Sequence, residues 1–503
     1  MSEQYANEQH FDFSGGMQQA VGRIIVSDNE YPLLINGHLE TVGPVTKTMG
    51  YIQKGSDVNT NYQILGLMGS YKTDGTTKFI TIADGASSSD AYTYNTTTNA
   101  WTKHNLSLSS GSNAEFEYFL NGFFMVNFTE ATRFNNYAQW YTTTNVTSAP
   151  KARYIKQYLS RLYLGYVSTD GSTYGSRVIY SDLPSDTSPQ TINWNNAVNF
   201  IDIDVDDGDV LKGLEVNANR LLMFKENAMY RYDTNSLYKV PGAPGTVSQR
   251  SIKNIQGKTI YLHSSGLWLY DGSTSTLISR KIKDIISKIS TVNLANACAY
   301  VSGDHYYIYI GDIDNTSKGI SINKCLIDYD IAKNAYALRS IVDISTVYVN
   351  YRDNRSFITY DDATVNYNQA DTVYNGLVDS ADKIFFGSSL GKVFQNNQGN
   401  SYDGTDIAFT LETKDYYLGY PSIFKLFQKV HAYVNGVKSM TLQYKTDDND
   451  WKTLGKINKA QSELIFPAGV RGKRIKFRVL ESSSADAFVF EGLDIYFIPE
   501  GLI

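Results

Sequence analysis

The 503-residue chain is poor in proline, cysteine and charge. It holds 10 prolines, two cysteines and 19% charged residues, and its formal net charge is −6 at pH 7. No basic cluster stands out, which argues against a protein that sequesters DNA or RNA by charge. The chain also lacks an apolar run of about 18 residues, the length that a transmembrane helix needs. We therefore expect no membrane span.

The N-terminus is too polar and too broken for a signal peptide, because no apolar segment follows a basic start. The two cysteines, Cys298 and Cys325, fall in separate predicted strands. Two thiols in so long a chain are more often buried and reduced than paired. A disulfide between them remains the alternative.

Aromatic residues, in contrast, are abundant. The 39 tyrosines and 23 phenylalanines fit the half-buried faces of strands. Runs of Ser, Thr, Asn and Gly separate the aromatic segments and are typical of turns. Only residues 280–289 indicate a short amphipathic helix, with four isoleucines at helical spacing. These are Ile282, Ile285, Ile286 and Ile289. The composition predicts an all-β protein.

A two-strand theme recurs between about residues 60 and 400: an apolar strand, a turn, then an aromatic strand. The units begin roughly 40 to 60 residues apart, which is the spacing of four-stranded propeller blades. Because such blades bury their faces only against one another, this span predicts a β-propeller of six to eight blades, with seven favoured. The segments that carry the theme are 79–82 with 91–95, 221–224 with 229–233, 259–262 with 267–272, 306–310 with 325–330, and 383–387 with 391–394.

Longer alternating strands follow residue 404. In one of them Ile475, Phe477 and Val479 share one face and cations the other, as in an antiparallel sheet with one solvated side. We expect a jelly-roll-like β-sandwich at 405–503, docked against a propeller at 59–400. Residues 1–58 would form an irregular segment that completes or clamps the propeller. The predicted sandwich strands are 407–412, 425–434, 440–446, 462–466, 473–480 and 488–497.

An acidic segment interrupts the propeller region. Asp202, Asp204 and Asp206 are candidate Ca²⁺ ligands, because D-x-D-x-D supplies the carboxylate oxygens that hard cations prefer. An EF-hand that started at Asp202 would need Gly at its sixth position, where Asp207 stands, and Glu at its twelfth, where Gly213 stands. Alternation with aliphatic residues instead favours an amphipathic strand that runs into an Asp-Gly turn. We expect no metal site here.

Motifs for catalysis are missing. The six histidines show no H-E-x-x-H spacing, and no G-x-S-x-G, P-loop or dinucleotide fingerprint occurs. The sequence predicts no catalytic residue, no cofactor and no enzyme. Carboxylate pairs on different blades, which glycoside hydrolysis would use, stay open because sequence spacing does not show them.

The aromatic residues have two interpretations. Rings on propeller loops would stack against sugars, whereas rings in strands pack between blades, which is the commoner role. Tyr137, Trp140 and Tyr141, which follow a polar Asn-Asn pair, are our candidates for exposed aromatic contacts.

Several short motifs together resemble one family. They are F-S-G-G-M at 13–17, N-G-H-L at 36–39, G-Y at 50–51, Y-S-D at 180–182, Trp194, D-G-D-V-L-K-G-L at 207–214, L-L-M-F-K at 221–225 and Tyr230. Gly15, Gly16, Gly37 and Gly43 mark points where the chain needs positive φ or close backbone approach. The pattern resembles phage tail nozzle (tail tubular protein B) chains, which are β-propeller virion structural proteins.

The resemblance implies a non-enzymatic component of a tailed-phage virion, located in the tail. It implies a closed ring, with a hexamer favoured, around the channel through which DNA leaves. Partners would be further copies of the chain, other tail or portal-adaptor proteins, and fibres. Genomic DNA would pass without specific binding, in keeping with the acidic net charge.

We place some of Asp202, Asp204, Asp206, Asp207 and Asp209 at the lumen or at a subunit seam. The alternatives are a carbohydrate-binding or glycan-cleaving propeller, and a head or neck decoration protein.

Overall fold

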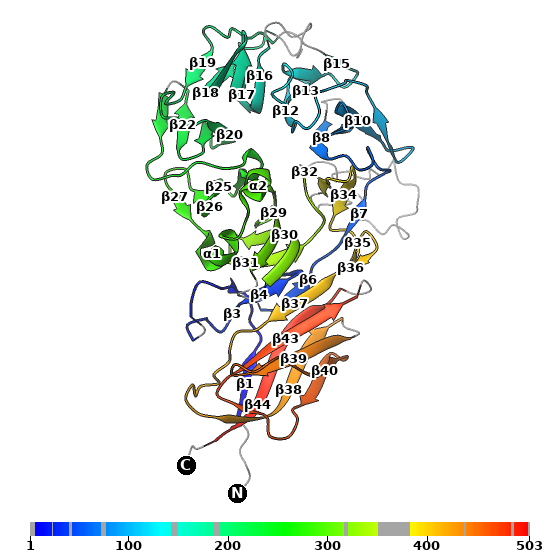
Figure 1. Cartoon of the computed structure of the whole chain (residues 1–503), viewed down its shortest axis with the longest axis vertical. Coiled ribbons are helices and arrows are strands. Elements are labelled where there is room, and N and C mark those ends of the chain that lie inside the picture. Colours follow the sequence, from blue (N-terminus) through cyan, green and yellow to red (C-terminus); the bar gives the residue numbers. More distant parts are fainter. Residues whose placement is uncertain are drawn as a thin grey trace, which may run out of the picture.

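The computed structural model describes two parts, a ring of small sheets and an elongated pair of sheets below it (Figure 1). It describes residues 6–22, 24–39, 43–71, 77–141, 149–185, 192–234, 236–315, 320–350, 383–436, 439–483 and 487–500. The first and last described strands, β1 (Ala6–His10) and β44 (Val489–Pro499), both lie in these paired sheets (Figure 1).

Five separate four-stranded antiparallel sheets follow one another along the chain, each in simple sequence order. Their strands are β8 (Ile64–Tyr71), β9 (Thr77–Ala83), β10 (Asp90–Asn95) and β11 (Ala100–Lys103); β12 (Glu115–Phe119), β13 (Gly122–Val126), β14 (Arg133–Asn135) and β15 (Trp140–Tyr141); β16 (Lys151–Tyr158), β17 (Arg161–Thr169), β18 (Ser172–Tyr180) and β19 (Phe200–Asp202); β20 (Leu211–Asn217), β21 (Arg220–Lys225), β22 (Met229–Asp233) and β23 (Ser236–Lys239); β24 (Lys253–Ile255), β25 (Lys258–His263), β26 (Gly266–Tyr270) and β27 (Ser275–Leu277).

Two further four-stranded runs lie within larger sheets. The sixth consists of β28 (Cys298–Ser302), β29 (His305–Asn315), β30 (Ile320–Asp330) and β31 (Ala335–Ser340). The seventh consists of β32 (Thr346–Asn350), β33 (Lys383–Gly387), β34 (Val393–Asn396) and the N-terminal strand β7 (Tyr51–Gln53). The short strands β35 (Ser401–Tyr402) and β36 (Thr405–Asp406) extend this last sheet.

The first strands of these units meet around the centre of the ring. Contacts run from β8 to β12, β16 and β20, and from β24 to β28, β32 and back to β8. Between these runs β20 contacts the 3₁₀ turn η3 (Gln249–Ser251), which leads into β24. The all-β class and the β-propeller are therefore confirmed, and the seven four-stranded units among the described residues lie within the predicted range.

The two-strand theme of the sequence corresponds to the middle strands of the units. The predicted pairs match β9 with β10, β21 with β22, β25 with β26, β29 with β30, and β33 with β34. Middle strands pair on both sides and pack on both faces, so they are the most apolar. The outermost strands β11, β15, β19, β23 and β27 have only two to four residues, which is why the sequence pattern marks them less clearly.

The single predicted helix is confirmed in outline. Residues 279–286 form a 3₁₀ turn, η4 (Ser279–Ile282), followed by α1 (Lys283–Ile286). All four isoleucines of the pattern are buried in the main hydrophobic cluster. A second short helix, α2 (Thr291–Asn296), was not predicted; its N-terminal cap is Ser290, whose hydroxyl accepts a hydrogen bond from the Asn293 amide.

Two antiparallel sheets make up the C-terminal part, and their buried faces share one hydrophobic cluster. Ile475, Phe477 and Val479 point into it, as the alternating pattern predicted. The hairpin partner β40 was missed. The strands are β37 (Ala408–Glu412), β38 (Lys425–Asn435), β39 (Met440–Thr446), β40 (Lys452–Ile457), β41 (Gln461–Ile465), β42 (Arg471–Gly472), β43 (Ile475–Ser482) and β44 (Val489–Pro499).

The N-terminal segment joins both parts. Strand β1 (Ala6–His10) pairs with β44, and β4 (Leu33–Ile35) lies between β31 and β37. The sixth propeller unit thereby continues into one C-terminal sheet as nine strands. The other N-terminal strands are β2 (Gly16–Met17), β3 (Glu30–Tyr31), β5 (Gly37–His38) and β6 (Val45–Lys47).

The glycines singled out in the N-terminal motifs have the predicted roles. Gly16 and Gly43 adopt positive φ of 75° and 108°. A Cβ on Gly15 would lie 2.7 Å from Asn29, and one on Gly37 would lie 2.5 Å from Leu34. Residues 40–42, which connect the N-G-H-L motif to Gly43, lie outside the described residues.

Cys298 and Cys325 are free and buried. Burial raises the pKa of both thiols, which keeps them protonated at neutral pH. Within the described residues, no helix is both long enough and apolar enough to cross a membrane.

Candidate functional site

The acidic segment lies at the outer edge of the third propeller unit, since β19 is the last strand of its sheet. Strand β19 ends at Asp202, sooner than the alternation predicted, and a turn follows. Both carboxylate oxygens of Asp202 accept hydrogen bonds from Arg177, from Nε at 2.6 Å and from Nη2 at 2.7 Å. Asp206 is exposed.

The rest of the segment folds around Lys225, whose side chain is fully buried. Its ammonium donates to Asp207 Oδ1 at 2.6 Å and to the Asp204 carbonyl at 2.8 Å. Asp204 also accepts a hydrogen bond from the Tyr230 hydroxyl at 2.6 Å. Asp209 accepts from the backbone amide of Asn227 at 2.8 Å.

These contacts explain the acidic segment as a loop pinned to its own propeller. Asp202 faces Arg177, whereas Asp204 faces Tyr230, so the two carboxylates point to different partners. Within the described ranges, no three His, Cys, Asp or Glu side chains gather as a metal site would require. The candidate Ca²⁺ ligands are thus not brought together.

The three candidate aromatic contacts pack inside the second propeller unit. Tyr137 is only 7% exposed, so the prediction that it is an exposed contact is wrong. Its ring and that of Trp140 stand edge-on to Phe123, at 6.1 and 5.3 Å between centroids. Tyr141 stacks on Phe134 at 4.5 Å. Trp140 and Tyr141 are half-buried. All three stabilise the sheet by cross-strand packing.

A charged cluster that the sequence did not reveal lies on the first strands of four units. Glu115 and Glu117 belong to β12, Lys156 to β16, Glu215 to β20 and Lys253 to β24. Figure 1 shows β12 and β20 on the side of their sheets nearest the centre of the ring, and β16 contacts both of them. We name these five residues the central cluster. From one strand to the next they stand roughly 40 to 60 positions apart in the chain, so no local sequence motif reveals them.

The central cluster is electrostatically coupled. Lys156 and Glu215 form an ion pair at 3.1 Å. Burial raises the pKa of Glu115 and of Glu117 to about 7, although Lys156 acts in the opposite direction on both. Burial also lowers the pKa of Lys253, and the neighbouring ammonium of Lys156 adds to that effect. Such shifts in a recessed position are typical of sites that bind or react.

A cavity of about 340 Å³ adjoins the central cluster at Glu115. Three cations line it: Arg153, Lys212 and Arg250. The guanidinium of Arg153 lies over the ring of Tyr166 at 4.0 Å, which fixes its position. We name this the cationic cavity. Its remaining lining comes from Ser112, Asn113, Asn127, Phe128, Tyr154, Val247, Ser248, Gln249 and Ala295.

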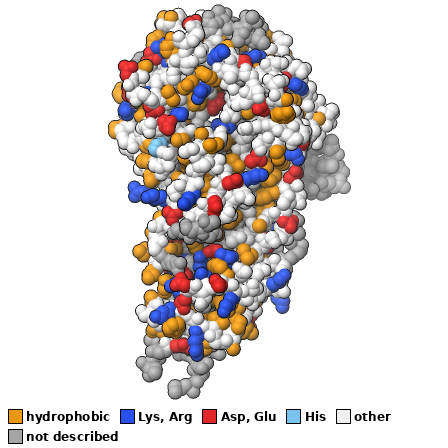
Figure 2. Space-filling view, in the orientation of Figure 1, with side chains coloured by type: hydrophobic (Ala, Val, Ile, Leu, Met, Phe, Trp, Pro, Cys, Tyr) orange, Lys and Arg blue, Asp and Glu red, His pale blue; other side chains and the backbone are white. Residues whose placement is uncertain are grey.

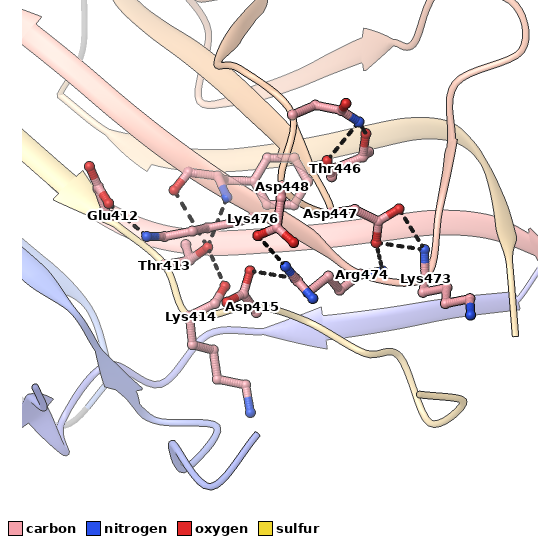
Figure 3. A network of polar contacts seen from close by, with 12 residues as sticks. Glu412, Thr413, Lys414, Asp415, Thr446, Asp447, Asp448, Lys473, Arg474 and Lys476 are labelled. Atoms are coloured by element: carbon pink, nitrogen blue, oxygen red, sulfur yellow. Dashed lines mark hydrogen bonds and ion pairs between the residues drawn. The ribbon is translucent and has the colours of Figure 1, made fainter. Parts of the chain in front are cut away.

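The C-terminal sheets carry a second polar network, on the solvated side of β43 (Figure 3). Glu412 accepts hydrogen bonds from Lys476 at 2.7 Å and from Arg478 Nε at 2.8 Å. Arg474 lies between Asp448, at 2.7 Å, and Asp415, at 3.5 Å. The charges of Glu412 and Arg474 are thus paired, and Asp447 accepts hydrogen bonds from the backbone amides of Lys473 and Arg474. We interpret this network as one that stabilises the sheet surface.

Comparisons with known proteins do not identify a family for this chain. No protein-family model matches the chain, and no curated protein matches it. Among solved structures that match is the crystal structure of BamB from Moraxella catarrhalis, at 10% sequence identity and a TM-score of 0.37, covering 66% of this chain and 84% of that one. A likeness of this degree carries no functional argument. The class of protein that the chain's own sheets define is an all-β protein with a β-propeller and additional sheets.

Proposed function

We propose that the chain is a non-enzymatic structural component of a tailed-phage virion. In this proposal it forms a closed ring of the tail, hexameric by preference, around the channel for DNA exit. The sequence motifs that resemble tail nozzle proteins are the first support. Neighbouring tail or portal-adaptor proteins and fibres would be its partners, and DNA would pass without specific binding.

The structural observation that carries the proposal is an apolar loop tip held out from the body. Ile24 and Ile25 are 70% and 73% exposed. The loop is anchored beside them: Lys414 pairs with Asp28 and donates to the Val26 carbonyl at 3.1 Å. A fixed, exposed pair of branched aliphatic side chains is typical of a protein–protein contact.

The surface is consistent with an assembly that does not hold DNA. Figure 2 shows charged side chains of both signs scattered over the visible face, without a large area of one sign. Lysine-rich areas, which bind phosphates, are not prominent on this face. The acidic segment lies at the outer edge of its propeller unit, a position from which it could face either the lumen of a ring or a subunit seam, the two places expected for it.

The test is the mass of the purified full chain by mass photometry, with negative-stain electron microscopy of the particles. We expect closed rings of one copy number. The double substitution Ile24→Asp with Ile25→Asp should shift the population to smaller species, because two charges would have to lose water at the contact. Val292→Asp is the matched control, since Val292 is 66% exposed on α2.

A wild-type chain that stays monomeric at all concentrations would overturn the ring. Antibody labelling of virions would then separate the remaining positions, because gold on the capsid supports a head protein and gold on the tail supports a tail protein. The glycan-binding alternative has lost one of its three proposed contact residues, since Tyr137 is buried, whereas Trp140 and Tyr141 are half-buried.

A further inference from the structure

The cationic cavity has more positive charge than its surroundings neutralise. Lys212 pairs with Glu226 at 3.2 Å. Arg153 and Arg250 form no ion pair within the described part of the chain. The Arg250 guanidinium donates a hydrogen bond to the Ser345 carbonyl instead. The Arg153 guanidinium lies over the rings of Phe128 and Tyr166. Two guanidinium groups thus line the cavity without an ion-pair partner among the described residues, and Glu115 is the one carboxylate in its lining.

The backbone around the cavity is held firmly. Gln249 bridges to β20 through both ends of its amide, accepting from the Leu214 amide at 2.7 Å and donating to the Leu214 carbonyl at 2.9 Å. A Cβ on Gly213 would lie 2.5 Å from the Gln249 side chain, so a larger residue there would displace this amide. The buried Ser248 hydroxyl donates to the Ala297 carbonyl at 2.8 Å. A rigid frame of this kind is what a binding site requires.

We propose that the cationic cavity binds a small oxyanion ligand, bearing carboxylate or phosphate-like groups, between Arg153, Lys212 and Arg250. Guanidinium groups present planar pairs of donors that match the oxygens of both kinds of group. The cavity volume suits a small molecule or one end of a chain and excludes a folded partner. This inference is independent of the ring.

The central cluster makes the binding depend on pH. Glu115 faces the cavity and is surrounded by Lys156, Lys253, Arg250 and Glu215, with Tyr154 beside it. Above pH 7 its carboxylate repels an anion, and below pH 7 it is protonated and neutral. Burial also raises the pKa of Glu117 to about 7, and Glu117 lies two residues further along the same face of β12. Anion affinity should therefore rise as the pH falls through about 7.

The experiment is isothermal titration calorimetry on the full chain at constant ionic strength, with sulfate and with citrate as separate probes. Sulfate keeps its charge between pH 6 and 8, so its pH dependence reports the protein alone. We expect Arg153→Gln to weaken binding about tenfold. Arg231→Gln is the matched control, because Arg231 also lies over a tyrosine, at 5.2 Å from Tyr238, but does not line the cavity.

Each outcome decides a part of the proposal. Citrate binding without sulfate binding supports a carboxylate ligand, and the reverse supports a tetrahedral oxyanion. Glu115→Gln should keep the binding and reduce its change between pH 6 and 8. Heat of binding for neither probe, or equal losses from Arg153→Gln and Arg231→Gln, would overturn the proposal.

Discussion

At the scale of single residues, the buried ion network around Asp328 makes the stability of the fold depend on the protonation of His305. Asp328 lies between His305, at 2.6 Å, and Arg339, at 3.0 Å. Burial lowers the pKa of His305, but the hydrogen bond and charge of Asp328 outweigh burial and raise it overall. Asp330 adds to the rise, and Arg339 opposes it. The protonated imidazole is therefore favoured in the folded chain.

This network predicts that stability falls as the pH rises past neutrality. A raised histidine pKa contributes stability that is complete below the unfolded value of about 6.5 and is lost as the pH rises through the folded value. His305→Gln keeps a hydrogen-bond donor for Asp328 and cannot titrate. We expect urea midpoints of the wild type to decrease between pH 6 and 8 by more than those of His305→Gln. Equal decreases in both proteins would contradict the assignment to His305.

Single side chains also show where sequence reasoning reaches its limit. Tyr137 follows a polar pair, and its own neighbours in the chain say nothing of Phe123, which covers it. Likewise Glu115 and Lys253 stand 138 positions apart in the numbering of the chain, and only closure of the ring brings their charges together. Burial and coupling of this kind depend on tertiary contacts, which local patterns do not contain.

At the scale of elements, closure of the propeller depends on a strand from the N-terminal segment. Strand β7 pairs with β34 in the seventh unit. Gly50 precedes it, donates its amide to the Gly399 carbonyl at 2.8 Å and packs so closely that a Cβ would lie 1.8 Å from the Ser401 carbonyl oxygen. Any side chain here would push β7 away from its partner.

Gly50→Ala should therefore loosen the closing strand. We expect a loss of about 1 to 3 kcal/mol in the free energy of unfolding, as for other overpacked sites. Hydrogen exchange should show faster exchange in β7 and β34. Gly22→Ala is the control, because a Cβ there meets nothing within 4 Å. Unchanged protection of β7 in Gly50→Ala would show that the chain relaxes around the methyl group.

Sequence patterns predicted elements best where an element carries a long, regular face. Strand β39 begins and ends at the predicted residues, and β43 has the predicted buried side. The N-terminal strands of two to five residues carry no periodicity, and β1, β4 and β7 have partners hundreds of residues away. The resemblance to tail proteins, in contrast, remains a prediction about function.

For the whole molecule, the nine-stranded sheet predicts that the propeller and the C-terminal sheets unfold together. Lys47 and Glu481 form a buried ion pair between the N-terminal segment and β43. Lys47→Met would leave Glu481 buried without its cation, at a cost of about 3 to 5 kcal/mol. Trp451 is the one tryptophan of residues 405–503. The fluorescence of Trp451→Phe therefore reports on the propeller, and the difference between it and the fluorescence of the protein with Trp451 reports on the C-terminal sheets.

We expect Lys47→Met to lower the thermal midpoint of both fluorescence signals equally. Lys452→Met is the control, because Lys452 is exposed and its loss should change the midpoint little. A midpoint that moves for Trp451 alone would show that the two parts unfold independently, in spite of the shared sheet.

The pairing of β1 with β44, which matches Ala6 to Phe497, has a consequence for synthesis on the ribosome. Strand β1 is made long before its partner β44, and β4 and β7 also wait for partners made much later. Until then their unpaired edges are exposed to other nascent chains. A chain that stopped before β44 would therefore leave β1 without its partner, and aggregation would be its expected fate.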